Sequence, residues 1–266
     1  MTELLDVAGL LDEAILEDTN DFPPPTSWRM SDLGKCLRMQ VLKRQGVVTP
    51  EPFTVKTRTL FRIGNLLEEE VLKWLSRKFQ VITKSATGDQ IKVSAPGYDA
   101  RGSLDGIGID NEGMFPIEVK STRDRGVDYA PYETHDLQAT AYALFLGLMR
   151  ACLVYIGRDG ARKVCWVYVT PKKEQRIKTE WAELAKWWLT DELPPVKPKV
   201  RAKKKVKGVW VDFTYEVNGV GFQKGEPKYE LDPECSRCPY LNFCWGDAHA
   251  AAADRGTETQ AAESAD

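Results

Sequence analysis

Apolar residues recur at helical spacing in three stretches near the start of the chain. The spacing predicts a short amphipathic helix over residues 3–17. A second helix is predicted over 31–45, with Ser31 as its N-cap residue and Gly46 just past its end. A third helix is predicted over 54–78. Its apolar face consists of Leu60, Ile63, Leu67, Val71 and Leu75.

From residue 79 the pattern changes to short apolar runs separated by Gly, Asp and Asn, which is typical of β-strands. Two helices, over about 133–148 and about 172–190, are interleaved with the later strands. This alternation indicates an α/β sandwich with a central mixed sheet flanked by helices. The six predicted strands are residues 79–85, 90–95, 101–110, 113–122, 151–158 and 163–170.

Composition divides the 266-residue chain into three parts. Residues 1–26 form an acidic segment that ends in a stiff proline-rich linker. Residues 27–246 form a single domain, and the acidic tail at 247–266 is predicted to be disordered. The domain carries a basic insertion at about 196–230, with a short hairpin expected within 208–223.

Charge is distributed unevenly along the chain. Residues 31–246 hold 35 bases and 27 acids, and residues 197–207 hold seven bases and no acid. A basic body favours a polyanionic partner, and the basic stretch is predicted to contact phosphates as a flexible arm. The alternative is a solvated linker. No apolar run reaches the length of a membrane span, and the acidic N-terminus lacks a secretory pattern. We therefore expect a cytoplasmic protein of a bacterial, archaeal or phage-infected cell, without a membrane partner.

The stretch "FPIEVKST" places two charged residues on one face of a predicted strand, because residues i and i+2 point to the same side. These residues are Glu118 and Lys120, and a hairpin would bring Asp105 beside Glu118. Two adjacent carboxylates repel each other unless a cation such as Mg²⁺ or Mn²⁺ joins them. A nearby lysine would orient an attacking water molecule or stabilise negative charge. The alternative is a solvated Glu–Lys pair on an edge strand.

Three further residues extend this candidate site. Glu68, on the third predicted helix, would supply another carboxylate, although a run of three acids is also typical of a solvated helix face. Gln138 and Tyr142 lie four residues apart on one face of the helix that follows the strand. They would contact a phosphate and stack on a base. Alternatively, they border a core stripe formed by Leu137, Ala141, Leu144 and Phe145.

The order Asp105, "EVK" at 118–120 and Gln138-x-x-x-Tyr142 resembles the PD-(D/E)xK nucleases of the RecB type, over roughly residues 27–245. The resemblance implies a restriction-endonuclease-like core in which Asp105 and Glu118 bind the metal and Lys120 is the catalytic lysine. Glu68 and the carbonyl of Val119 would complete the metal site, and Gln138 and Tyr142 would hold the DNA strand. Many members of this family have a histidine at the place that Glu68 takes here, after Gly64.

Six cysteines occur in the chain, and three of them form a Cys-x2-Cys-x5-Cys cluster. In a reducing cytosol such clusters suggest a metal site with a fourth thiolate, whereas Cys152 and Cys165 fall in apolar strands and are predicted to be core thiols. One early cysteine followed by this late cluster resembles the iron–sulfur nucleases, including the CRISPR-associated exonucleases and AddB. The resemblance implies a [4Fe–4S] cluster that ties the N- and C-terminal segments into one lobe, with Zn²⁺ as the alternative. The implied ligands are Cys36, Cys235, Cys238 and Cys244.

These patterns together predict a metal-dependent DNA exonuclease that acts on single-stranded or end-bearing DNA. The expected setting is DNA processing, recombination or CRISPR adaptation, with a recombination protein or an integrase as partner. The alternative is a non-catalytic module that binds DNA or docks a partner while retaining the fold and a zinc or iron–sulfur site.

Overall fold

The computed structural model describes residues 6–17, 24–47, 54–122, 126–197, 200–201, 203–206, 209–212, 229–230, 232–235 and 238–246. The chain divides into two compact units, Met1–Leu193 and Pro194–Asp266. The predicted tail at 247–266 lies outside the described residues.

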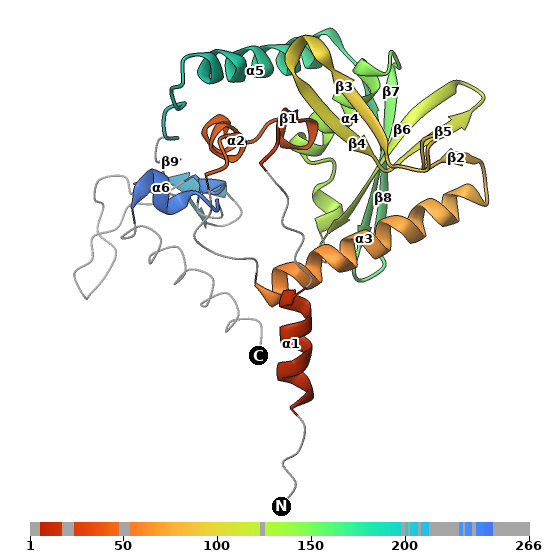
Figure 1. The fold of residues 1–266 in the computed structure, drawn as a ribbon, viewed down its shortest axis with the longest axis horizontal. Helices are drawn as coiled ribbons and strands as arrows, with labels where there is room; N and C mark the ends of the chain where they lie inside the picture. The colour runs from red at the N-terminus through yellow and green to blue at the C-terminus, as the bar shows by residue number, and fades with distance from the viewer. Residues whose placement is uncertain are drawn as a thin grey trace, which may run out of the picture. The chain divides into compact units, whose positions relative to one another are not determined.

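The first unit is built on a five-stranded sheet with the strand order β2-β5-β6-β7-β8 (Figure 1). The central strand β6 pairs in parallel with β7, and the other neighbours pair antiparallel. The predicted mixed sheet is therefore confirmed. The strands are β2 (Gln80–Ile82), β5 (Gly106–Asp110), β6 (Gly113–Thr122), β7 (Arg150–Gly157) and β8 (Arg162–Tyr168).

A second, three-stranded sheet consists of β1 (Trp28–Arg29), β4 (Ala100–Leu104) and β3 (Ile91–Ala95). The single strand predicted over 101–110 is wrong, because the chain forms β4, leaves its sheet at Asp105 and enters the other sheet as β5. The break has a packing cause. Gly102 lies directly against the ring of Tyr142, and Gly106 lies against Leu72 and Val81, so each half of the segment packs on a different layer.

Helices cover both faces of the five-stranded sheet (Figure 1). On one face, α3 (Val55–Ser76) buries Val71 and Leu72 against Ile117, Val119 and the neighbouring strand β7. On the other face, α4 (Glu133–Phe145) packs its alanines against β7 and β8. The helix α5 (Pro171–Leu189) packs on α4, where its Trp181 is fully buried in the core shared with the small sheet. This arrangement is the predicted α/β sandwich.

Two of these helices begin where the sequence indicates. The hydroxyl of Thr54 accepts a hydrogen bond from the N–H of Thr57, and the hydroxyl of Thr170 accepts one from Lys173, which caps the first turns of α3 and α5. Pro171 follows Thr170 at the first helical position, where its missing N–H costs nothing.

The helix predicted over 31–45 is wrong in its first half. The chain forms a 3₁₀ turn, η1 (Met30–Asp32), and α2 begins only at Leu37 and ends at Arg44. Gly34 has a φ of +78°, a conformation that interrupts a right-handed helix. Its N–H donates to both carboxylate oxygens of Glu180, at 2.9 and 3.0 Å, so a tertiary contact replaces the helical hydrogen bond.

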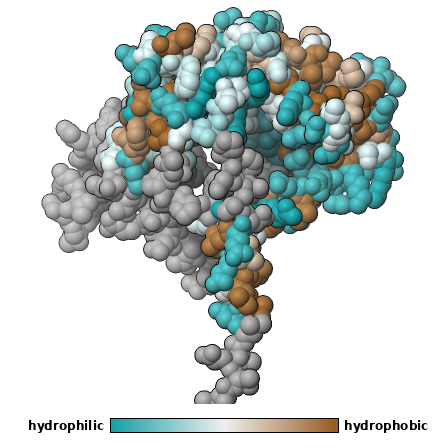
Figure 2. Space-filling view, in the orientation of Figure 1, coloured by the Kyte–Doolittle hydropathy of each residue, from teal (hydrophilic) through white to brown (hydrophobic). Residues whose placement is uncertain are grey.

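The described N-terminal helix α1 (Val7–Glu17) contacts α3 but buries none of its own residues. Figure 2 shows apolar residues at the surface of this helix. Val7 and Leu11 are among its exposed side chains. No described helix combines the length and the apolar character that crossing a bilayer requires. The short 3₁₀ helices η2 (Pro96–Tyr98) and η3 (Gly126–Tyr129) complete the elements of this unit.

The described residues of the second unit form two small antiparallel ladders and one helix. Strand β9 (Val200–Arg201) pairs with β12 (Tyr229–Glu230), and β10 (Lys203–Val206) pairs with β11 (Val209–Asp212). The described hairpin thus begins earlier than the predicted one at 208–223 and takes up part of the basic stretch. The remaining element is α6 (Leu241–Trp245).

Candidate active site

Asp105 lies at the junction of β4 and β5, directly across from the next strand of the sheet. The register pairs Gly106 with Ile117, so Asp105 stands beside Glu118. The Oδ2 atom of Asp105 accepts a hydrogen bond of 2.7 Å from the backbone N–H of Val119. The predicted proximity of Asp105 and Glu118 is confirmed, because the antiparallel β5–β6 hairpin forms as expected.

Glu118 is a buried carboxylate in the central strand β6, with only 3% of its surface exposed. Its Oε1 atom accepts hydrogen bonds from Lys120 Nζ at 2.5 Å and from Gln138 Nε2 at 2.7 Å. Its Oε2 atom is buried and has no hydrogen-bond partner within the part of the chain that the structure describes. The alternative of a solvated Glu–Lys pair on an edge strand is therefore wrong.

The helix α3 brings a third carboxyl group to this place. The side chain of Glu68 is partly buried and shares a hydrogen bond with that of Asp105. Its neighbours differ, since Glu69 is exposed and Glu70 pairs with Lys73 at 3.0 Å. The interpretation as a solvated run of acids thus describes Glu69 and Glu70 but not Glu68.

Gln138 and Tyr142 extend the cluster from α4 into the core. The amide of Gln138 also donates to the hydroxyl of Tyr142 at 2.9 Å, and this hydroxyl donates to the carbonyl of Ser103 at 2.8 Å. Both side chains are buried, and Tyr142 belongs to the core cluster of this unit. In this structure they hold Glu118 in place, while their contact with a DNA strand stays a prediction.

Burial, followed by the charges of neighbouring groups, shifts the pKa values of the titratable groups Glu68, Asp105, Glu118 and Lys120. Burial raises the pKa of Glu118 to about 8, and the charge of Asp105 adds to the rise while Lys120 opposes it. Burial and the neighbouring Asp105 raise the pKa of Glu68 to about 7, and burial also raises the pKa of Asp105. Burial acts to lower the pKa of Lys120, but the three carboxylates together hold it above its ordinary value. Three carboxyl groups close together beside one ammonium therefore retain protons near neutral pH, which a divalent cation would displace.

Two properties of this donor set fit a hard divalent cation. Its available groups are oxygens, including the unpartnered Oε2 of Glu118, and its carboxylates repel one another. Among the described residues, no group of three or more His, Cys, Asp or Glu side chains is already arranged around one metal position. Side-chain rotation of Glu68 and Glu118 would thus have to accompany metal binding.

Gly102 and Ser103 are parts of this site that sequence reasoning missed. A Cβ atom added to Gly102 would stand 2.4 Å from Cε1 of Tyr142, so only glycine leaves room for the ring. Ser103 contributes through its backbone carbonyl, which no side-chain pattern shows. The available signal was the run of small residues in "RGSLDG", immediately before Asp105.

We expect the Gly102→Ala substitution to lower the free energy of unfolding by about 1–3 kcal/mol, because the added methyl group overpacks a site between the ring of Tyr142 and the Cβ atom of Met30. Chemical denaturation would measure the change. Gly97→Ala is the matched control, since a Cβ there meets nothing within 4 Å. Equal stability of the two variants would contradict the tight contact with Tyr142.

The predicted cysteine ligands are divided between the units. Cys36 immediately precedes α2 in the first unit, whereas the other three belong to the second. There, the N–H of Cys238 donates to the carbonyl of Cys235 at 3.1 Å. The N–H of Cys244 donates to the carbonyl of Tyr240. The described cysteines form no assembled group of metal ligands. The four-cysteine cluster and its lobe stay a prediction.

The two other cysteines lie in the paired strands β7 and β8. Cys152 is buried, and burial raises the pKa of its thiol to about 11. Cys165 is partly buried and packs against the core on the α4 side. The prediction of core thiols is confirmed for Cys152 and holds in part for Cys165.

No family model matches this chain, and no curated protein matches its sequence. Among solved structures, the chain is similar to SSO0001, with a TM-score of 0.49 and 16% identity over 90% of this chain and 96% of that one. It is also similar to the alkaline exonuclease LHK-Exo of Laribacter hongkongensis, with a TM-score of 0.46 and 13% identity over 69% and 93%. A phage-related exonuclease of Haemophilus somnus 129PT gives a TM-score of 0.43 and 11% identity over 57% and 78%. These similarities are distant, and the chemistry of the site rests on this chain's own residues.

Proposed function

We propose that this chain is a metal-dependent deoxyribonuclease of the PD-(D/E)xK type that hydrolyses phosphodiester bonds, acting as an exonuclease on single-stranded or end-bearing DNA. One observation carries the proposal: Asp105, Glu118 and Lys120 converge beside Glu68 at the centre of the sheet, where three carboxyl groups surround one ammonium. Burying three carboxyl groups beside one ammonium costs stability, and a protein that only binds DNA has no use for this arrangement.

The proposed cofactor is Mg²⁺ or Mn²⁺. Glu68, Asp105 and Glu118 would hold it, together with the carbonyl of Val119. When bound, the ion would make a water molecule more acidic and neutralise charge on the phosphate.

The protein's own residues then have distinct tasks. Lys120 stays protonated near neutral pH, because the surrounding carboxylates raise its pKa, and its ammonium orients the attacking water and stabilises charge on the phosphate oxygens. Gln138 holds Glu118 from the side of α4, and Tyr142 fixes Gln138 through the carbonyl of Ser103. Hydrolysis forms one P–O bond from water and breaks the bond to one sugar oxygen, which takes up a proton.

The test is degradation of end-labelled DNA by the purified full chain with Mg²⁺ or Mn²⁺, and with a chelator. We expect loss of linear single strands only when metal is present, and resistance of circular single strands identifies an exonuclease. Lys120 and Asp105 variants purified in parallel exclude a contaminating enzyme. Linear DNA that stays intact with both metals would refute the proposal.

A non-catalytic DNA-binding module is the second candidate. Its support is that Oε1 of Glu118 is satisfied by Lys120 and Gln138 without a metal, and that no metal site is assembled among the described residues. DNA binding without cleavage, under every metal condition of the same assay, would establish this function instead.

We further propose that Cys36, Cys235, Cys238 and Cys244 bind a [4Fe–4S] cluster. The support is their spacing in the chain and the turn that joins Cys235 to Cys238. A partner in recombination or CRISPR adaptation belongs to this proposal as well.

Protein purified without oxygen is expected to be brown with broad visible absorption, and Cys238→Ala is expected to remove most of this absorption. Cys165→Ala is the matched control and should keep the colour, because Cys165 packs against the core of the sheet. A colourless protein with one equivalent of zinc would favour the zinc alternative.

A further inference from the structure

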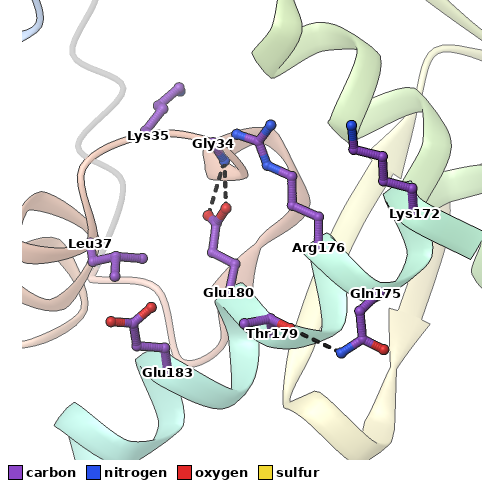
Figure 3. A pocket seen from close by; sticks show the side chains of 9 residues that line it. All are labelled: Gly34, Lys35, Leu37, Lys172, Gln175, Arg176, Thr179, Glu180 and Glu183. Atoms are coloured by element: carbon purple, nitrogen blue, oxygen red, sulfur yellow. Dashed lines mark hydrogen bonds between the residues drawn. The ribbon is translucent and has the colours of Figure 1, made fainter.

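A shallow groove of about 460 Å³ lies between the turn before α2 and one face of α5 (Figure 3). Its α5 residues lie at helical spacing, so they form one continuous wall. The groove is lined by Gly34, Lys35, Leu37, Lys172, Gln175, Arg176, Thr179, Glu180 and Glu183.

Positive and negative groups are separated within this groove. In Figure 3, Lys35, Arg176 and Lys172 lie along one rim across the upper part of the view, whereas Leu37 and Glu183 lie below Lys35 on the left. The carboxylate of Glu180 lies between them and is already engaged by the N–H of Gly34 and by Nε2 of Gln40, the latter at 3.1 Å. The rim therefore presents three cationic side chains to an incoming ligand.

These cations can exchange their present partners at low cost. Arg176 pairs with Glu133 at the surface, where both side chains are exposed, and such pairs contribute little to stability. Lys35 shares Asp32 with Lys43, so Asp32 keeps one partner if Lys35 moves. Lys172 is exposed and forms no ion pair with any described residue. A phosphate would offer each of them a stronger, charge-assisted hydrogen bond.

The groove adjoins the catalytic cluster through the first turn of α4. A Cβ added to Gly34 would meet Leu137 and Thr134, so the groove floor rests on the helix that carries Gln138. His135 lies on the same turn, with Nδ1 3.1 Å from the hydroxyl of Tyr155. Burial, together with the charges of Lys120 and Lys35, lowers the pKa of His135 to about 4, so its ring lies within electrostatic reach of both the cluster and the groove.

We propose that the groove binds backbone phosphates of a single DNA strand that extends from the catalytic cluster, with Lys35, Lys172 and Arg176 as the phosphate contacts. The inference rests on the proposed function, because it gives the path that the DNA substrate of that function follows along the protein. The ligand class is the phosphodiester backbone, and the groove offers no flat aromatic face that would select a base.

The test measures the affinity of fluorescent single-stranded DNA by anisotropy at several salt concentrations, with a chelator present so that binding is separated from cleavage. We expect the Lys172→Gln, Arg176→Gln double variant to bind about tenfold more weakly than the unaltered chain. The slope of log affinity against log salt should fall by about 1.4, because each phosphate contact to a single strand contributes about 0.7. The single variant Lys172→Gln alters an exposed side chain and should lower the slope by about 0.7.

The matched control is the Lys73→Gln, Lys178→Gln double variant, which removes the same charge from α3 and from another face of α5. Its affinity and salt slope should stay near those of the unaltered chain. Equal behaviour of the two double variants would overturn the proposal. The unaltered chain could bind DNA, with an affinity that falls on groove substitution, and yet cleave no DNA with metal present. This result would support the groove proposal and refute the proposed nuclease function.

Discussion

Replacement of Lys120 by alanine is expected to reduce metal-dependent DNA cleavage by about 100-fold or more. The ammonium of Lys120 contacts Glu118 at 2.5 Å in a mostly buried position, where the charges of Asp105 and Glu68 also act on it. A preorganised donor of this kind contributes roughly 10²–10³ to a rate when charge develops beside it. The reaction should slow mainly in kcat, because Lys120 acts on the reacting phosphate and not on the length of the strand.

Single-turnover cleavage of a labelled strand at saturating Mn²⁺ would measure this loss. Lys92→Ala is the matched control, since Lys92 is an exposed lysine of β3, and its cleavage rate should stay unchanged. DNA affinity measured in a chelator should fall far less than the rate. If the alanine variant kept a third of the activity, Lys120 would have no catalytic role.

Asp105→Asn is expected to abolish cleavage to a similar extent while leaving the metal-free protein as stable as before, or more stable, at pH 8. The amide oxygen of asparagine can still accept the hydrogen bond from Val119, but it no longer repels Glu118 and Glu68. Loss of one carboxylate from the metal-binding groups lowers the affinity of the site for a hard cation. Function and stability therefore move in opposite directions, as they do where an active site stores repulsion.

The sign of the pH dependence follows from the raised pKa values. Between about 4.5 and 8 the folded protein holds protons on Glu68 and Glu118 that the unfolded chain has already released. The stability of the metal-free protein should therefore fall as pH rises through this window. In Asp105→Asn the fall should be smaller, because one of the causes of both raised pKa values is gone.

Thermal unfolding from pH 5 to pH 9 in a chelator would measure this slope. Asp191→Asn is the control, since Asp191 is exposed at the end of α5 in a left-handed conformation that asparagine tolerates. Normal DNA cleavage by the Asp105→Asn variant would show that Asp105 is not part of the active site. An unchanged pH slope would show that its charge does not act on the neighbouring carboxylates.

Local patterns in the sequence were sufficient to predict the part of the site that one hairpin and one helix contain. Alternation in β6 placed Glu118 and Lys120 on one face, and the β5–β6 hairpin placed Asp105 beside them. The spacing of four residues placed Gln138 and Tyr142 on one side of α4, where they form a hydrogen bond. Each of these relations is set by backbone geometry over short separations, so the order of residues determines it.

Other features required the packing of distant segments. Glu68 differs from Glu69 and Glu70 only because the rotation of α3 against the sheet turns one acid of the three toward Asp105. The strand predicted over 101–110 breaks at Asp105 because its two halves pack on different layers.

The sequence by itself determined that Glu118 and Lys120 share one face of a strand and that Asp105 lies beside them. Only the tertiary structure decided that Glu118 is buried, with one oxygen that has no hydrogen-bond partner among the described residues, and that Gly34 interrupts a predicted helix by donating to Glu180, 146 residues away. The physical reason is that periodicity and capping depend on neighbouring residues. Burial and long-range hydrogen bonds depend instead on which faces of separate elements exclude water together.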